Sequence, residues 1–455
     1  MEKFQKNDFQ DVTLNNTNVR AGFYHGNFIR IFPEELVSDC KNAIKFSNKI
    51  DHLVRAEIFL EEENRFIIKH PIVKNVTFPP EWTLLQRVEA ALAILSIQKE
   101  LIKHGYYLSD PHGYNITFDR DKPIYIDYGS IVKGKIWPAY WFLRLFLNYG
   151  VEDYWAAILK VSKIRTFIIL IRMLINEKKA YSAVEGSFQK IRSRKISERD
   201  TNEFNLFERL LQVQKIKNIL KKVRKVFVKN NLYLSLESLL LKRIQHGDTD
   251  WSYYGQENLS DSSIEESAKI KSFTELMKRD IPAKMIDIAA NKGVFSQLAI
   301  QYGVKEVIAT DIDERSLDIL RNKAKNKNLP IWVAKLDLMN HPEKLGGLKD
   351  MSSAEERLNA DYSICFALVH HLCYFGNYSF EDFAKAIEKF VNKILIVEFV
   401  PYNDICLAGP VYRGKDKSWY NENNFVQAMK KYFKGDIEIF ESHPSSRKLI
   451  RFQRI

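Results

Sequence analysis

The feature that most constrains the fold of this chain is a regular alternation of apolar strands and helices between residues 284 and 399. The first strand, "KMIDIA", runs through the turn "ANKG" into the helix "VFSQLAIQYG". Four more strand segments follow: "EVIATDID", "IWVAKLD", "ADYSICFAL" and "KILIVEFV". Strands that alternate with helices are typical of a parallel sheet covered by helices on both faces. The sequence therefore predicts a doubly wound α/β domain.

Acidic residues fall at or near the ends of these predicted strands. Asp287 lies in the first strand, Asp311 in the last part of the second, Asp337 at the end of the third and Glu398 near the end of the fifth. In open α/β sheets, ligands bind beyond the carboxyl ends of the strands, where a carboxylate after the second strand can accept hydrogen bonds from both hydroxyls of a ribose. Asp337 could accept from an adenine amino group. A lone acid at a strand end is more often a helix N-cap, but three in register favour a cofactor that contains adenosine.

The turn after the first strand distinguishes between two such cofactors. Ala289 and Ala290 are small and Gly293 can adopt a positive φ, so the backbone can approach a ligand closely. NAD also needs a strand, a turn, a helix and a ribose-binding acid, but its fingerprint is G-x-G-x-x-G and this turn contains one glycine. The turn fits S-adenosylmethionine better, because that cofactor has no phosphate and needs no pyrophosphate cradle.

Several segments of this region resemble the class I S-adenosylmethionine-dependent methyltransferases, and among them the group that contains the NoeA-type nodulation proteins. The segments are "DIAANKGVFSQLA", "ATDID", "FALVHHL", "ILIVEFVPYND" and "SSRKLIRF". The resemblance runs from about Trp251 to Ile455, and "ALVHHL" followed by "EFVPYND" is its most specific part. The group usually has glycine where this chain has Ala289, so a methyl group stands where the cofactor would pass.

The resemblance implies a cofactor site in which Asp287 and Gly293 lie by the methionine part, Asp311 binds the ribose and Asp337 lies by the adenine. The full set of expected cofactor contacts is Asp287, Ala289, Asn291, Gly293, Asp311, Ile312 and Asp337.

The same resemblance places a pair of histidines in the expected catalytic region. His370 and His371 follow the fourth strand, and a histidine near the sulfonium could take the proton of a hydroxyl as the methyl group leaves sulfur. We expect His371 to be the base, with His370 second. Glu398 and Asp404 are alternative bases, or ligands for substrate hydroxyls. A simpler interpretation is that one histidine only hydrogen-bonds a backbone carbonyl.

A second motif lies in the first third of the chain. The segment "LSDPHGYNITFDRDKPIYIDYGS" follows a long predicted helix, Thr83 to Gly105, and contains Asp110, Asn115 and Asp127. It resembles the catalytic loop and the metal-binding D-F-G of protein-kinase-like and aminoglycoside-phosphotransferase-like enzymes. In those enzymes the first Asp orients the acceptor hydroxyl, and the Asn and the second Asp hold magnesium on ATP.

Other parts of the kinase signature are missing. There is no G-x-G-x-x-G loop near the start, and the strand expected to carry a phosphate-binding lysine offers Arg30 instead. Lys69 could substitute, but its strand comes too late in the order. We therefore expect a kinase-like domain that is degenerate rather than active. The simpler alternative is that Asp110 and Asn115 shape a turn before a hairpin.

The sequence divides into three regions: a kinase-like α+β domain over 1–135, a helical connector over 136–248, and the methyltransferase domain over 249–455. The most apolar run, Thr166 to Ile175, is too short to span a membrane and contains Arg172. No signal peptide is expected at the N-terminus. The cysteines are too scattered for a zinc site or a disulfide framework, which favours a cytoplasmic location.

A formal charge of +12 makes contact with an anionic membrane or a phosphorylated substrate plausible. Nucleic acid is a weaker expectation, since the sequence has no recognised RNA-binding module. We expect methyl transfer from S-adenosylmethionine to an oxygen of a sugar, a glycan or a related small acceptor, a class that rests on the family resemblance alone. The alternatives are an ATP- and magnesium-dependent phosphotransferase, alone or combined with the methyltransferase, and a scaffold in which both folds are relics.

Overall fold

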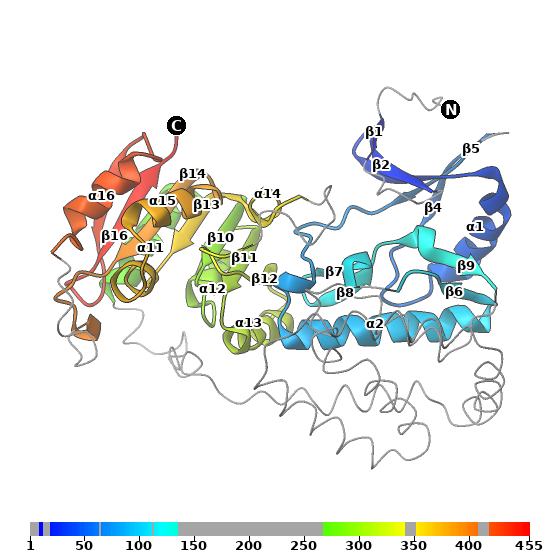
Figure 1. The fold of residues 1–455 in the computed structure, drawn as a ribbon, viewed down its shortest axis with the longest axis horizontal. Helices are drawn as coiled ribbons and strands as arrows, with labels where there is room; N and C mark the ends of the chain where they lie inside the picture. The colour runs from blue at the N-terminus through cyan, green and yellow to red at the C-terminus, as the bar shows by residue number, and fades with distance from the viewer. Residues whose placement is uncertain are drawn as a thin grey trace, which may run out of the picture.

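The structure is a computed structural model, which describes residues 9–11, 19–62, 65–111, 113–134, 267–341, 352–407 and 418–455. These residues form an N-terminal domain (9–134) and a C-terminal domain (267–455), which lie beside each other in Figure 1. The helical connector expected over 136–248, including the apolar run Thr166 to Ile175, lies outside the described residues. So does the segment 249–266, with which the third region was expected to begin.

A five-stranded antiparallel sheet forms the first half of the N-terminal domain, in the order β1-β2-β3-β5-β4. The strands are β1 (Phe9–Asp11), β2 (Arg20–Tyr24), β3 (Asn27–Phe32), β4 (Glu57–Glu62) and β5 (Arg65–His70). His25 and Gly26, both with positive φ, make the tight turn between β2 and β3. Helix α1 (Glu34–Ser47) follows β3 and packs Cys40 against Phe66 and Ile68 in one apolar core.

The second half of this domain consists of a long helix and two small hairpins. Helix α2 (Leu84–Lys103) starts after its N-cap Thr83, which exchanges hydrogen bonds with Gln86 in a capping box, and the chain leaves it through Gly105 with a φ of 79°. The short elements are η2 (Pro79–Glu81), η3 (Gly113–Asn115) and η4 (Tyr128–Ser130), and the pairs β6 (Tyr106–Leu108) with β9 (Ile131–Lys133) and β7 (Ile116–Asp119) with β8 (Lys122–Tyr125). Although α2 is the longest described helix, no helix in the described part of the chain is long and apolar enough to cross a membrane.

The C-terminal domain is built on a seven-stranded sheet in the order β12-β11-β10-β13-β14-β16-β15. The strands are β10 (Lys284–Ile288), β11 (Glu306–Asp311), β12 (Ile331–Lys335), β13 (Ala360–Cys365), β14 (Val391–Phe399), β15 (Ile437–Glu441) and β16 (Lys448–Gln453). The first five strands pair in parallel, as the alternation predicts. The last two pair antiparallel, which the expectation of a parallel sheet missed. Only residues 442–447 separate β15 from β16, which is too short for the crossover that a parallel pair needs.

Helices cover both faces of this sheet. Helices α11 (Ala268–Arg279), α12 (Val294–Gln301) and α13 (Glu314–Asn326) share one apolar core, and α14 (Ala354–Leu358), α15 (Phe380–Glu388) and α16 (Glu422–Lys430) share the other. The arrangement confirms the Rossmann-like α/β domain predicted for this region.

The order in which consecutive strands are added to the sheet reverses at β10. From β10 the chain moves outward through β11 to β12, and it then returns to pair β13 with the other side of β10. Ligands of open α/β sheets bind at this switch point, outside the carboxyl ends of the strands. The residues that follow β10, β11, β12, β13 and β14 therefore line the edge at which a site is expected.

Candidate active site

The turn between β10 and α12 is built from left-handed backbone. Ala289, Asn291 and Gly293 have φ values of 63°, 49° and 69°. A Cβ on Gly293 would lie 2.4 Å from Cδ1 of Leu320 in α13, so backbone conformation and packing both require glycine there. Ala289 occupies a conformation that glycine adopts more easily. The turn is thus strained at one alanine and packed closely against α13.

Asp311, the last residue of β11, is held by backbone amides on both sides. The N–H of Asn291 donates to Oδ2 at 2.8 Å, and the N–H of Asp313 donates to Oδ1 at 2.9 Å. Burial raises the pKa of Asp311, and the two backbone hydrogen bonds counteract that rise. Each carboxylate oxygen can still accept a further bond, because an ionised carboxylate has about four acceptor sites. Ile312, the next residue, is 58% exposed.

Asp287 lies within β10 and its carboxyl group is buried. Ser296, in the first turn of α12, donates to Oδ2 at 2.6 Å. Burial raises the pKa of Asp287 to about 7, and the negative charge of Asp311 adds to the rise while Ser296 and Lys269 oppose it. Asp287 and Asp311 therefore form a pair of coupled acids at the carboxyl ends of neighbouring strands.

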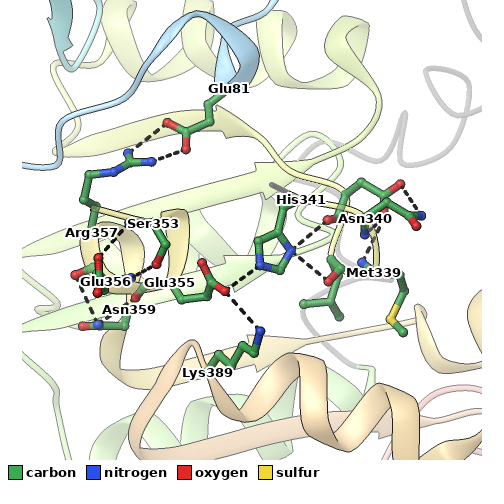
Figure 2. A network of polar contacts seen from close by, with 12 residues as sticks. Glu81, Met339, Asn340, His341, Ser353, Glu355, Glu356, Arg357, Asn359 and Lys389 are labelled. Atoms are coloured by element: carbon green, nitrogen blue, oxygen red, sulfur yellow. Dashed lines mark hydrogen bonds and ion pairs between the residues drawn. The ribbon is translucent and has the colours of Figure 1, made fainter. Parts of the chain in front are cut away.

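Asp337, which follows β12, binds its own turn. Its Oδ1 accepts from the N–H of Met339 at 3.0 Å and of Asn340 at 3.2 Å, and the side chain of Asn340 donates to Oδ2 at 3.0 Å. Figure 2 shows Met339 and Asn340 in this turn, next to His341. These hydrogen bonds within a turn are ordinary for an acid that follows a strand. Asp337 is also exposed, so the rest of its carboxylate remains accessible.

The two histidines lie in a single π-type turn, η6 (His370–Phe375), that follows β13, and their ring centres are 4.0 Å apart. Burial, more than the neighbouring positive charges, lowers the pKa of His370 to about 3, and burial and Arg447 lower the pKa of His371. Both rings are therefore neutral near pH 7. Nδ1 of His370 is buried and makes no hydrogen bond within the described residues.

Glu398 in β14 is fully buried and doubly bound. Its Oε2 accepts from Lys269 Nζ at 2.8 Å, and its Oε1 accepts from Ser442 Oγ at 2.7 Å. The ammonium of Lys269 also lies 5.1 Å and 5.0 Å from the ring centres of Phe295 and Phe366. A carboxylate in an ion pair of this kind holds Lys269 in place and has little capacity left to take a proton from a substrate.

Asp404 has a similar arrangement near the histidines. Arg447 donates to it twice, from Nε at 2.9 Å and from Nη2 at 3.0 Å, and Ser446 Oγ donates to Oδ2 at 2.7 Å. Glu398 and Asp404 are held in ion pairs with Lys269 and Arg447, whereas both histidines are neutral near pH 7. The lowered pKa of the two histidines also makes them weak proton acceptors.

The sheet order places the expected residues in one row along the carboxyl edge: Asp337, Asp311, Asp287, His370 with His371, and Glu398. Sequence reasoning missed the two cations in this row. Arg447 lies in the segment "SSRKLIRF", which resemblance singled out without a role, so a signal existed. No local sequence pattern points to a role for Lys269, because only the structure brings it close to Glu398.

The expected ATP and magnesium residues of the N-terminal domain lie around the β7–β8 hairpin. Oδ1 of Asp127 is 3.3 Å from Nη1 of Arg30, whose Nη2 donates to the carbonyl of Ile126 at 2.9 Å. The side-chain amide of Asn115 donates to the backbone carbonyl of Asp110 at 2.9 Å. Within the described residues, no three His, Cys, Asp or Glu side chains gather as they would around a metal ion.

Comparison with known proteins gives one curated relative and many related folds. The chain is 24% identical over 385 residues to nodulation protein NoeA of Rhizobium meliloti (strain 1021), which covers 80% of this chain and 77% of that protein. No protein-family model matches the sequence.

Three solved structures are similar to part of the chain. The methyltransferase domain of a bacterial protein, CtHen1, is 14% identical and covers 40% of this chain and 96% of its own, with a TM-score of 0.30. Magnesium protoporphyrin IX methyltransferase from Synechocystis PCC 6803, with bound S-adenosylmethionine, is 16% identical over 47% of this chain and 89% of its own, with a TM-score of 0.29. A TehB-like S-adenosylmethionine-dependent methyltransferase from Corynebacterium glutamicum is 12% identical over 40% and 87%, with a TM-score of 0.28. The likeness is one of fold.

Proposed function

We propose that the C-terminal domain transfers a methyl group from S-adenosylmethionine to an oxygen of a small acceptor, such as a sugar or a glycan. The observation that carries this proposal is one hydrogen bond near the ends of β10 and β11. The backbone N–H of Asn291, in the left-handed turn after β10, donates to the carboxylate of Asp311. This hydrogen bond places the small-residue turn next to the acid that would bind the ribose, and an adenosine-containing cofactor needs both.

The residues present fit this cofactor. Asp311 keeps acceptor capacity for ribose hydroxyls, Asp287 offers a carboxylate for an ammonium group, and Gly293 keeps the turn free of a side chain. Ile312, exposed beside Asp311, offers an apolar surface for an adenine ring. When bound, S-adenosylmethionine supplies a methyl group on a positively charged sulfur, which an acceptor oxygen can take as it loses its proton.

The protein would receive that proton on a histidine. His370 and His371 are both neutral near pH 7, and Nδ1 of His370 is a buried acceptor or donor without a partner among the described residues. General-base catalysis typically contributes 10²- to 10⁴-fold in rate when the pKa of the base lies near the working pH. The lowered pKa of both histidines therefore places their expected contribution at the lower end of that range. Lys269 is paired with Glu398, and Arg447 is paired with Asp404. These two ion pairs would fix the segments that surround the histidines.

Calorimetric titration with S-adenosylhomocysteine tests the proposal. We expect micromolar binding by the wild type and no measurable binding by Asp311→Ala. The matched control is Asp361→Ala, which removes an exposed acid from β13, near the start of that strand, where it pairs with Lys393. Loss of binding in Asp311→Ala but not in Asp361→Ala supports the site, and an unchanged affinity in Asp311→Ala would rule it out.

The phosphotransferase alternative remains a prediction for the N-terminal domain. Arg30 already neutralises Asp127, which a magnesium ion would need, and this is why the methyltransferase activity is the main proposal. Magnesium-dependent binding of ATP that disappears in Asp127→Ala would establish the alternative. Contact with an anionic membrane or a phosphorylated acceptor likewise remains a prediction from the net charge.

A further inference from the structure

The N-terminal domain contacts the C-terminal domain through several hydrogen bonds and ion pairs. On the N-terminal side the contacting residues lie in the segment before and within α2 and in the β7–β8 turn, and on the C-terminal side they lie mainly in α13 and α14, beside β11 and β12. In Figure 1 the N-terminal domain stands next to β12, and β15, β16 and α16 lie at the opposite end of the sheet. The contact is therefore on the β12 side of the sheet. It also includes the ion pair of Lys74 with Glu306, the first residue of β11, which lies at the opposite end of that strand from Asp311.

The first contact is a buried ion pair between Glu81 of η2 and Arg357 of α14. Nη1 of Arg357 donates to Oε2 of Glu81 at 2.9 Å, and Nη2 pairs with Oε1, so the two groups meet in a two-pronged arrangement. The guanidinium also donates to the carbonyl of Val76 at 2.6 Å and lies 4.6 Å from the ring centre of Phe78. Arg357 thus binds the N-terminal domain with almost its whole charged group.

The helix that carries Arg357 also holds the loop that contains Asp337. Glu355, in the same five-residue helix, lies 3.0 Å from Nε2 of His341 and accepts a hydrogen bond from Lys389 at 3.3 Å. The other ring nitrogen, Nδ1, faces the carbonyls of Asp337 and Leu338 at 3.3 Å and 3.1 Å, and because carbonyls only accept, Nδ1 carries a proton. Figure 2 shows this series of contacts running from Glu81 through α14 to His341.

The second contact reaches the helix that follows Asp311. Thr83, the N-cap of α2, donates from Oγ1 to Oδ1 of Asp318 in α13 at 2.5 Å. Arg321, one turn further along α13, pairs with Glu89 of α2 and lies 5.2 Å from the ring centre of Phe118. Asp318 and Arg321 are only 3% and 4% exposed, although both are ionisable. The N-cap of α13 is Asp313, and its N–H donates to Asp311. Helix α13 therefore links the residues of this contact to Asp311, the expected ribose acid.

We propose that the N-terminal domain positions the adenosine end of the cofactor site, through Glu81 on Arg357 and Thr83 on Asp318. The inference rests on the proposed function, because it assigns Asp311 and Asp337 to the ribose and the adenine. Glu81, Thr83, Asp318 and Arg357 are positioning residues: they hold α13 and α14, which in turn set the place of Asp311 and the Asp337 turn. Removing one partner of a buried ion pair leaves the other charge uncompensated, so we expect α13 and α14 to shift when the contact is broken.

The test compares S-adenosylhomocysteine with adenosine as ligands of the full-length chain. In Glu81→Gln and Arg357→Met, the affinity for both ligands should fall by the same factor, about tenfold, which is typical of energetic coupling between distant sites. Asp287→Asn should weaken S-adenosylhomocysteine and leave adenosine unchanged, because Asp287 is assigned to the methionine end. Hydrogen exchange of the amides at 337–341 should rise in the two interface variants.

The matched control is Arg279→Met, which removes the ion pair between Arg279 in α11 and Glu438 in β15, far from the N-terminal domain. It should leave both affinities unchanged. Wild-type affinity for both ligands in a folded Glu81→Gln variant would overturn the inference, as would an equal loss in Arg279→Met. If Arg357→Met does not fold, Arg357→Lys and Glu81→Gln carry the test. Failure of the wild type to bind S-adenosylhomocysteine would refute the proposed function instead.

Discussion

Each domain places an acid at or just after the end of a strand, but the two acids have different partners. Asp127 in the N-terminal domain lies 3.3 Å from the guanidinium of Arg30. Asp311 in the C-terminal domain is held by two backbone N–H groups. An arginine neutralises a carboxylate, whereas amide groups orient it and leave its negative charge available. The comparison shows that the same residue type keeps its charge available in one domain and forms an internal ion pair in the other.

The glycines beside these acids sharpen the comparison, and they give the largest expected effect. Gly293→Ala places a Cβ 2.4 Å from Leu320 at a φ of 69°, so it should lower the free energy of unfolding by about 2–4 kcal/mol. Gly129→Ala, beside Asp127, places a Cβ in ordinary contact 3.4 Å from Asp127 and should change it by less than about 1 kcal/mol. Urea denaturation measures both, and equal losses would contradict the distinction.

The titration of Asp287 gives the next largest effect. Burial raises its pKa to about 7, so its carboxyl group becomes neutral below that pH. A ligand ammonium needs the charged form, and the affinity for S-adenosylhomocysteine should therefore fall as the pH drops from 8 to 6, by up to about tenfold per pH unit. Calorimetry at several pH values measures this, and Asp287→Asn should remove most of the dependence. A flat profile in the wild type would refute the role of Asp287.

The stability of the ligand-free protein should depend on Asp287 in the opposite direction. The folded-state pKa, about 7, lies above the unfolded value of 3.8, so the folded chain binds more protons than the unfolded chain between those values. The contribution of this group to the free energy of unfolding therefore decreases as the pH rises through that window. Asp287→Asn should unfold at higher urea concentration than the wild type at pH 8.

The smallest effect is expected at Ala289. Its φ of 63° strains an alanine, and Ala289→Gly relieves that strain while giving the unfolded chain more freedom. The net gain in the free energy of unfolding should be below about 1 kcal/mol, measured by urea denaturation. The methyl group is also removed from the turn, so the affinity for S-adenosylhomocysteine should rise slightly. Weaker binding by Ala289→Gly would show that the methyl group contacts the cofactor favourably.

Much of the C-terminal domain follows from local sequence patterns. Five strands, the helices between them and the acids at their ends were predicted, because apolar periodicity and turn residues act over a few positions. The antiparallel pair β15 and β16 was missed, since the strand order depends on pairing with β14 rather than on the residues within each strand. In the N-terminal domain, α2 was predicted from the same kind of local pattern.

The sequence did not predict which of these side chains are buried or held in ion pairs. Glu398 was a candidate base, but its charge is held by Lys269, which lies 129 positions earlier in the chain. Asp404 depends in the same way on Arg447. Asp318 and Arg321 are polar residues of an amphipathic helix, for which a solvated face is the ordinary expectation, yet the N-terminal domain buries them.

The sequence by itself determined the strands and helices, the small-residue turn after β10 and the row of acids along the carboxyl edge of the sheet. Only the tertiary structure decided which of those charges are held in ion pairs and which are held by backbone amides, and that the N-terminal domain contacts α13 and α14. The physical reason is the distance along the chain over which each property is determined. Backbone conformation depends on neighbours a few residues away, whereas the burial and pairing of a charge depend on groups brought together from distant parts of the chain.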